Sequence, residues 1–215
     1  KCMALADSAF TIISATKELI RDLTNKRDRA NAISLRKSNE AKTVEERFIE
    51  SITQLANAAN EEQFLQDIEK SVKLKEDVYQ LQQRSNLDNK IAWNLGNQVK
   101  IKDQELNNLK TLASKIQSTS VSSTFEETLV LFSSYKKILN VADTLADYTD
   151  QLMAITNDKT TFNVPQSELA FADNLKKAYK NNTLLAEMNN GIPAFDEKVP
   201  IVVVDKSTNV QESSS

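Results

Sequence analysis

Residues 4–23, ALADSAFTIISATKELIRDL, carry the pattern that decides the fold. Small and apolar side chains recur there at alternating spacings of four and three: Leu5, Ala9, Ile12, Thr16, Leu19 and Leu23. Such spacing places them along one face of an α-helix. Neither Gly nor Pro occurs between residues 4 and 59, and both residues would weaken a helix interior. We therefore expect one long, continuous first helix.

The middle of this helix is more polar than its ends. The apolar pattern thins across residues 24–43 and resumes with Val44, Phe48, Ile52, Leu55 and Ala59. Two interpretations stay open for the polar part. It is either exposed to solvent or packed through small residues such as Ala30 and Ala32.

A second helical region is expected after Asn60, a suitable N-cap residue followed by Glu61 and Glu62 in the first turn. One apolar stripe comprises Leu65, Ile68, Val72 and Tyr79. Another comprises Leu95, Val99, Leu106, Leu109, Ala113 and Ile116, with Lys102 in one core position. The stripes are out of phase across residues 82–89, which is either a turn or a phase slip within one helix. The absence of Gly and Pro there favours the slip.

Two shorter helices are expected after the hydroxyl-rich break STSVSST at residues 118–124. The third helix covers residues 125–156 and the fourth covers residues 166–189, with Leu129 and Leu185 among the side chains expected to face inward. Asn190 and Gly191 end the fourth helix. The chain is therefore expected to form an elongated, all-α antiparallel bundle of about four helices, the first two long and coiled-coil-like. Residues 1–191 form the bundle, and residues 192–215 form an extended or disordered, non-helical C-terminal tail.

The composition argues against most catalytic chemistry. The chain contains 2 Gly, 3 Pro, 1 Cys and no His. Without His, the commonest general base and the Glu-x-x-His ligand pairs of helical di-metal sites are missing. Two isolated glycines cannot build a phosphate-binding loop. We therefore expect no enzyme activity, no catalytic residue, no cofactor and no metal site.

A local excess of positive charge lies in the polar middle of the first helix. Residues 26–42 contain six basic side chains, Lys26, Arg27, Arg29, Arg36, Lys37 and Lys42, against two acidic ones. These residues are candidates for contact with an anionic lipid surface, although most charge runs on long helices are simply solvated. The chain as a whole has a formal charge of −3, so a nucleic-acid partner is not expected.

The only cysteine stands at the second position of the sequence. The chain opens Lys1-Cys2-Met3, and a cysteine at such a place is a candidate lipid anchor of a cell-envelope protein. Lys1 argues against this, because a lipid-modified cysteine should be the first residue. An incidental thiol is the favoured alternative.

The sequence therefore predicts a non-enzymatic binding or scaffolding protein that engages an unidentified protein through helical surfaces. A tethered, lipoprotein-like domain at the cell envelope is one form of this hypothesis, and an extracytoplasmic location is its consequence. Homo-oligomer formation stays open. The alternative is a peripheral membrane-surface module that uses the basic stretch of the first helix.

Overall fold

The structure is a computed structural model that describes residues 2–118, 125–157 and 161–189. The long helices are α1 (Cys2–Thr53), α2 (Glu61–Ser118) and α3 (Phe125–Asn157). The shorter elements are the 3₁₀ turn η1 (Gln54–Asn57) and the helices α4 (Gln166–Lys180) and α5 (Leu184–Asn189). No strand occurs among these residues, and the long first helices pack against each other, so the expected all-α bundle class is confirmed. The predicted tail at residues 192–215 lies outside the described residues.

The described chain forms two compact units. Unit 1 contains residues 2–31, 90–118 and 125–157, and unit 2 contains residues 32–89 and 161–189. Each unit is built from parts of α1 and α2. Unit 1 adds α3, whereas unit 2 adds α4 and α5.

Helix α2 resolves the alternatives at residues 82–89, because it continues through them without a turn. Its buried positions follow the spacing of four and three from Phe64 to Leu109, except at Gln82, Ser85 and Asp88, which are separated by three residues twice in succession. This extra short step is the phase slip, and it overwinds the helix locally. Asn60 caps α2 as predicted, accepting a hydrogen bond of 2.9 Å from the backbone N–H of Gln63.

The polar middle of α1 is packed by small residues in the structure. In unit 2, Ser34, Ser38 and Ala41 are fully buried. The hydroxyl of Ser34 donates to the backbone carbonyl of Ser85 at 2.9 Å, and the hydroxyl of Ser85 donates to the carbonyl of Ser34 at 2.9 Å. Only small side chains allow two helix backbones to approach this closely. In unit 1, Ala30 is buried as the small-residue interpretation requires, but Ala32 in unit 2 is exposed.

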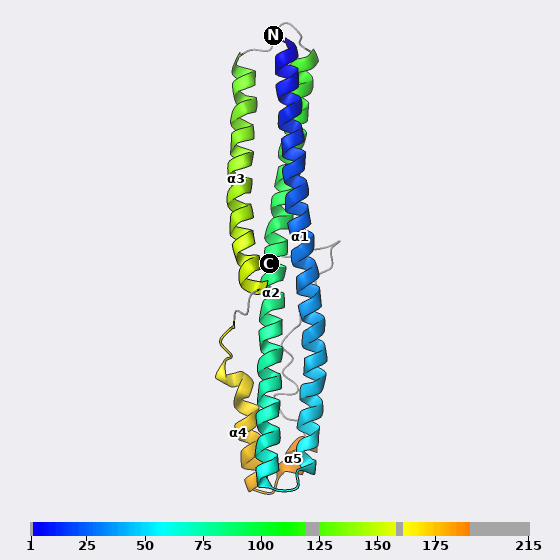
Figure 1. Cartoon of the computed structure of the whole chain (residues 1–215), viewed down its shortest axis with the longest axis vertical. Helices are drawn as coiled ribbons and strands as arrows, with labels where there is room; N and C mark the ends of the chain where they lie inside the picture. The colour runs from blue at the N-terminus through cyan, green and yellow to red at the C-terminus, as the bar shows by residue number, and fades with distance from the viewer. Residues whose placement is uncertain (1, 119–124, 158–160, 190–215) are drawn as a thin grey trace. The chain divides into compact units, whose positions relative to one another are not determined.

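The hydrophobic core of unit 2 joins the end of α1, the start of α2 and the two short helices (Figure 1). Its buried members are Phe48, Ile52, Leu55, Phe64, Ile68, Phe171, Ala172, Leu175, Ala178 and Leu184. Phe48 and Phe171 meet edge to face with ring centroids 5.1 Å apart, and Phe64 stacks on Tyr179 at 4.1 Å. The sequence pattern assigned Leu65 to this face, but Leu65 is 43% exposed and its neighbour Phe64 fills the core position.

Two polar contacts fix α4 and the segment before it on the α2 surface. The buried Lys75 ammonium lies 3.5 Å from the Glu168 carboxylate and 5.3 Å from the Phe48 ring centroid. The Gln80 side-chain amide forms two hydrogen bonds with the Phe162 backbone, at 2.5 and 2.7 Å. The desolvation of such a buried pair offsets much of its attraction, so its net contribution to stability is small.

The single fourth helix expected over residues 166–189 is wrong, because the chain breaks at Asn181–Thr183. Asn182 adopts a left-handed conformation with φ of 59°, which Asn tolerates better than most residues. The N–H of Asn182 bonds to the carbonyl of Tyr179, and the N–H of Thr183 bonds to that of Ala178. This is the Schellman pattern that ends helices.

Two leucines that the sequence placed in the core are exposed. Leu185 follows the break in α5 and is 65% exposed, so its prediction rested on a helix register that ends earlier. Leu129 is 51% exposed on α3. Both residues show that apolar character alone does not identify the buried face.

Phe171→Ala tests the core of unit 2. Removing this 2%-exposed ring should lower the free energy of unfolding by about 3–5 kcal/mol, because it leaves a cavity between α4 and the hairpin of α1 and α2. Urea unfolding followed by circular dichroism measures the change. Leu185→Ala is the control and should change stability by less than about 0.5 kcal/mol. Equal losses in both variants would contradict this core assignment.

Candidate functional site

The six basic residues of the first helix divide into two groups. Lys26, Arg27 and Lys37 have side chains only 18%, 18% and 19% exposed, and each lies beside a carboxylate. The ion pairs are Lys26 with Asp22 (3.1 Å) and Asp150 (3.5 Å), Arg27 with Asp28 (3.3 Å) and Lys37 with Glu40 (3.6 Å). These three bases therefore contribute to the helix surface largely as neutralised pairs.

The other three bases are Arg29 in unit 1 and Arg36 and Lys42 in unit 2. All three are exposed, and none is within ion-pair distance of an acidic side chain among the described residues. Within unit 2, the six-residue spacing of Arg36 and Lys42 separates them by roughly 120° around the helix. Contact with an anionic surface stays a prediction, and its best-placed residues are these three.

Lys26 titrates differently from an isolated lysine. Burial alone would lower its pKa, but hydrogen bonding and charge attraction from Asp22 and Asp150 outweigh burial and raise the pKa above 10.5. The ion pair with Asp150 also links α1 to α3 within unit 1. The positive charge of Lys26 is therefore paired with carboxylates inside unit 1.

The candidate anchor Cys2 is the first residue of α1, and its side chain lies outside the part of the chain that the structure describes. Within the described residues, the helices lack any stretch with the length and apolar character required to cross a bilayer. Those residues also contain no group of three or more acidic, cysteine or histidine side chains arranged to hold a metal ion.

An apolar groove lies between α2 and α3 in unit 1. We call it the apolar groove. It encloses about 470 Å³ and is lined by Gln98, Asn140, Val141, Thr144, Leu145 and Tyr148. Tyr148 is 55% exposed and Val141 is 45% exposed, while Leu145 is half-buried. Large apolar side chains gathered in an accessible groove are typical of a binding surface.

The groove exists because α3 has two apolar strips. Ala142, Thr149 and Met153 are buried against the other helices of unit 1. Val141 and Tyr148 each stand one position earlier than a buried residue, so they lie roughly 100° around the helix from the core. Helices α1 and α2 cover only the first strip, and the second strip remains accessible.

Sequence reasoning missed the groove, although one signal for it was readable. The sequence pattern assigned no role to Val141 or Tyr148. The apolar positions of α3 occupy a wider arc than a single packing face requires, which indicates a second contact surface. The pattern could not tell which part of that arc the other helices would cover.

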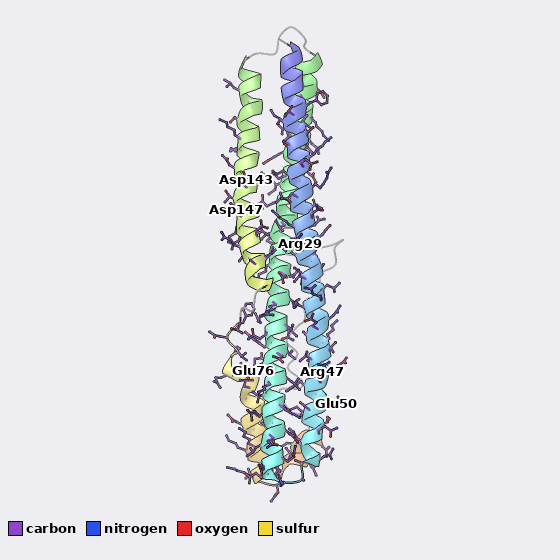
Figure 2. All side chains as sticks on the ribbon, in the orientation of Figure 1. Arg29, Arg47, Glu50, Glu76, Asp143 and Asp147 are labelled. Atoms are coloured by element: carbon purple, nitrogen blue, oxygen red, sulfur yellow. The ribbon has the colours of Figure 1, made fainter. Side chains whose placement is uncertain are left out.

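Charge is distributed unevenly along α3. Lys136 and Lys137 lie in its middle, whereas residues 138–157 contain Asp143, Asp147 and Asp150 and no base. Both lysines and all three aspartates are exposed, and Figure 2 labels Asp143 and Asp147 on this helix. Of the three acids, only Asp150 has an ion-pair partner among the described side chains. Residues 136–137 of α3 are thus basic and residues 143–150 carry the acids, but helical spacing places Asp143 and Asp147 more than 100° around the helix from Val141 and Leu145, so they lie outside the groove lining.

A second, polar groove lies at the hairpin end of unit 2. It encloses about 590 Å³ and is lined by Arg47, Glu50, Ser51, Gln54, Asn57, Ala58, Ala59, Gln63, Asp67 and Lys70. Arg47 and Glu50 belong to α1 and are exposed (Figure 2). The hydroxyls of Ser51 and Ser71 lie 2.8 Å apart and tie the two helices together there. Basic and acidic side chains are balanced in this groove, which therefore has no preference for one sign of charge.

Comparisons of this chain with protein-family models, with characterised proteins and with solved structures give no match. The functional argument therefore rests on the geometry of the surfaces described above.

Asp150→Asn tests the ion pair inside unit 1. At neutral pH the variant should be less stable by up to about 1 kcal/mol, because an amide no longer attracts the Lys26 ammonium. A lysine whose pKa is raised on folding contributes its full stabilisation at pH values below 10.5. This contribution disappears as the pH rises through the pKa of the folded state. The stability gap between wild type and variant should therefore close above that pH in urea titrations. Asp147→Asn is the control, and a comparable gap there would contradict the assignment.

Proposed function

We propose that this chain is a non-enzymatic protein-binding or scaffolding module that contacts its partner through a helical surface, the apolar groove of unit 1. The observation that carries the proposal is the accessible pair Val141 and Tyr148, 45% and 55% exposed beside the half-buried Leu145. Such residues bury substantial apolar area when a second protein covers them. Aromatic side chains in a concave surface are also the usual centres of binding energy.

The groove has the dimensions of a helix-binding surface. Val141, Leu145 and Tyr148 follow one another at spacings of four and three, which covers about two helical turns or roughly 10 Å. Gln98 on α2 forms the opposite wall. An amphipathic helix with apolar residues at the same spacing would fill this surface as in other helix-in-groove complexes.

Site-specific photo-crosslinking tests the proposal. A photoreactive amino acid in place of Thr144, inside the groove, should give a discrete adduct with another polypeptide in the source cells. The same group in place of the exposed Glu46 in unit 2 is the control and should not give that adduct. Adding Val141→Glu should suppress the adduct, because a carboxylate in the groove would have to be desolvated on binding. The absence of any polypeptide adduct at Thr144 would overturn the proposal.

A second candidate function, binding to an anionic membrane surface, is favoured by the exposure of Arg29, Arg36 and Lys42. Each basic residue near such a surface contributes about 1 kcal/mol. Binding would be peripheral, since it would rest on charge attraction at the lipid headgroups.

Vesicle sedimentation separates this candidate from the first. If it holds, the triple variant Arg29→Glu, Arg36→Glu and Lys42→Glu should lose about a hundredfold or more in affinity for phosphatidylserine-containing vesicles. The matched control carries the same charge change on three other exposed lysines, Lys90, Lys100 and Lys110. Equal binding of both variants, or no binding by the wild type, would exclude the membrane-surface function.

A further inference from the structure

We propose that Asn181 is the acceptor of an N-linked glycan, transferred from a lipid-diphosphate-linked oligosaccharide. The inference goes beyond the proposed function, because it concerns the turn between α4 and α5 in unit 2 and does not involve the apolar groove. Residues 181–183 read Asn-Asn-Thr, the only place in the 215 residues where Asn is followed two positions later by Ser or Thr. Because the middle residue is not Pro, the acceptor motif for N-glycosylation is complete.

The structure gives this motif the surroundings that an acceptor requires. All three of its residues are exposed. They form the break between α4, which ends at Lys180, and α5, which begins at Leu184. In a continuous helix, residues two positions apart lie roughly 200° apart around the axis, so one enzyme could not contact the side chains of Asn181 and Thr183 together. The break removes this obstacle, which the apolar pattern of the sequence had concealed.

The backbone of the turn is held by α4, whereas the two side chains that a transferase reads are available. The N–H of Asn181 bonds to the carbonyl of Lys177 at 3.0 Å. The N–H of Thr183 bonds to the carbonyl of Ala178 at 2.9 Å. The side-chain amide of Asn181 has no hydrogen-bond partner among the described residues. The hydroxyl of Thr183 reaches the Ala178 carbonyl only at 3.4 Å, which is longer than an ordinary hydroxyl hydrogen bond.

A glycan at this position is compatible with the folded core of unit 2. Ala178 and Leu184 on either side of the motif are buried members of that core, whereas the motif itself is exposed. Sugars attached to Asn181 would therefore extend into solvent without displacing a packed side chain.

The transfer is balanced without an oxidant or a reductant. The side-chain nitrogen of Asn181 forms a bond to the anomeric carbon of the oligosaccharide, and the bond from that carbon to the diphosphate oxygen breaks. The lipid diphosphate leaves with the electron pair, and one amide proton passes to a base of the transferase. The Thr183 hydroxyl identifies the acceptor to the enzyme by hydrogen bonding. Because this motif is modified in secreted proteins, the proposal requires that the turn reaches an extracytoplasmic compartment.

Mass spectrometry of the protein as its source cells produce it tests the proposal. A glutamate-specific protease releases residues 169–187, a peptide that contains the whole motif. The peptide should carry the added mass of an oligosaccharide. Electron-transfer fragmentation, which leaves the sugars on their residue, should locate that mass on Asn181 and not on Asn174 or Asn182. Recovery of this peptide only in its unmodified form would overturn the proposal.

Variants expressed in the same cells test whether the motif itself is read. Thr183→Ala should lose the added mass although Asn181 is unchanged, and Thr183→Ser should keep it, because serine retains the hydroxyl. Asn182→Gly is the matched control. It alters the same turn, tolerates the positive φ of residue 182 and leaves the motif intact, so the added mass should remain. Circular dichroism of each purified variant establishes that the helices are retained. An added mass that persists in Thr183→Ala would contradict recognition of this motif.

Discussion

One uninterrupted helix provides the surface on which both units are built. Helix α2 runs from Glu61 to Ser118, and its buried positions serve unit 2 up to Asp88 and unit 1 from Ile91 onward. Helix α2 contains no proline, and Gly96 is its only glycine, so no residue in it interrupts the helical hydrogen bonds between Glu61 and Ser118. In each unit, the helices that pack against α2 do so along this row of buried positions.

That row contains more polar residues than a helical core usually does. Lys75, Gln82, Ser85, Asp88 and Lys102 are all at most 7% exposed. Buried polar groups are costly without partners, and the structure provides partners of several kinds. Lys102 lies 3.0 Å from Glu105, Lys75 contacts Glu168 and a phenyl ring, and Ser85 bonds across to Ser34. The contacts of Lys75 and Ser85 reach other helices of unit 2 and favour one register of packing there, whereas the Lys102–Glu105 pair lies within α2.

The candidate site arises because helices cover the apolar surface less completely in unit 1 than in unit 2. Unit 2 covers its hairpin with α4 and α5, and its core is closed around Phe48, Phe64 and Phe171. In unit 1, α3 packs one apolar strip inward and leaves Val141 and Tyr148 accessible. Among the described residues, this exposed strip is the surface that most resembles a protein-binding interface.

The sequence by itself determined the all-α class, the approximate bounds of the three long helices and the cap at Asn60, because these follow from local spacing and residue type, and the absence of Gly and Pro favoured continuity through residues 82–89. The residue types at Asn181–Thr183 also tolerate a helix break. The apolar pattern continues on both sides of them, however, and therefore predicted a single helix. The tertiary structure alone decided which apolar residues are covered, placing Phe64 inward and Leu65 outward, and leaving Leu129, Val141 and Tyr148 accessible. It likewise brought Asp150 to Lys26 and so removed one base from the predicted basic surface. The reason is physical: helix periodicity is set by hydrogen bonds between near neighbours, whereas burial depends on helices that arrive from distant parts of the chain.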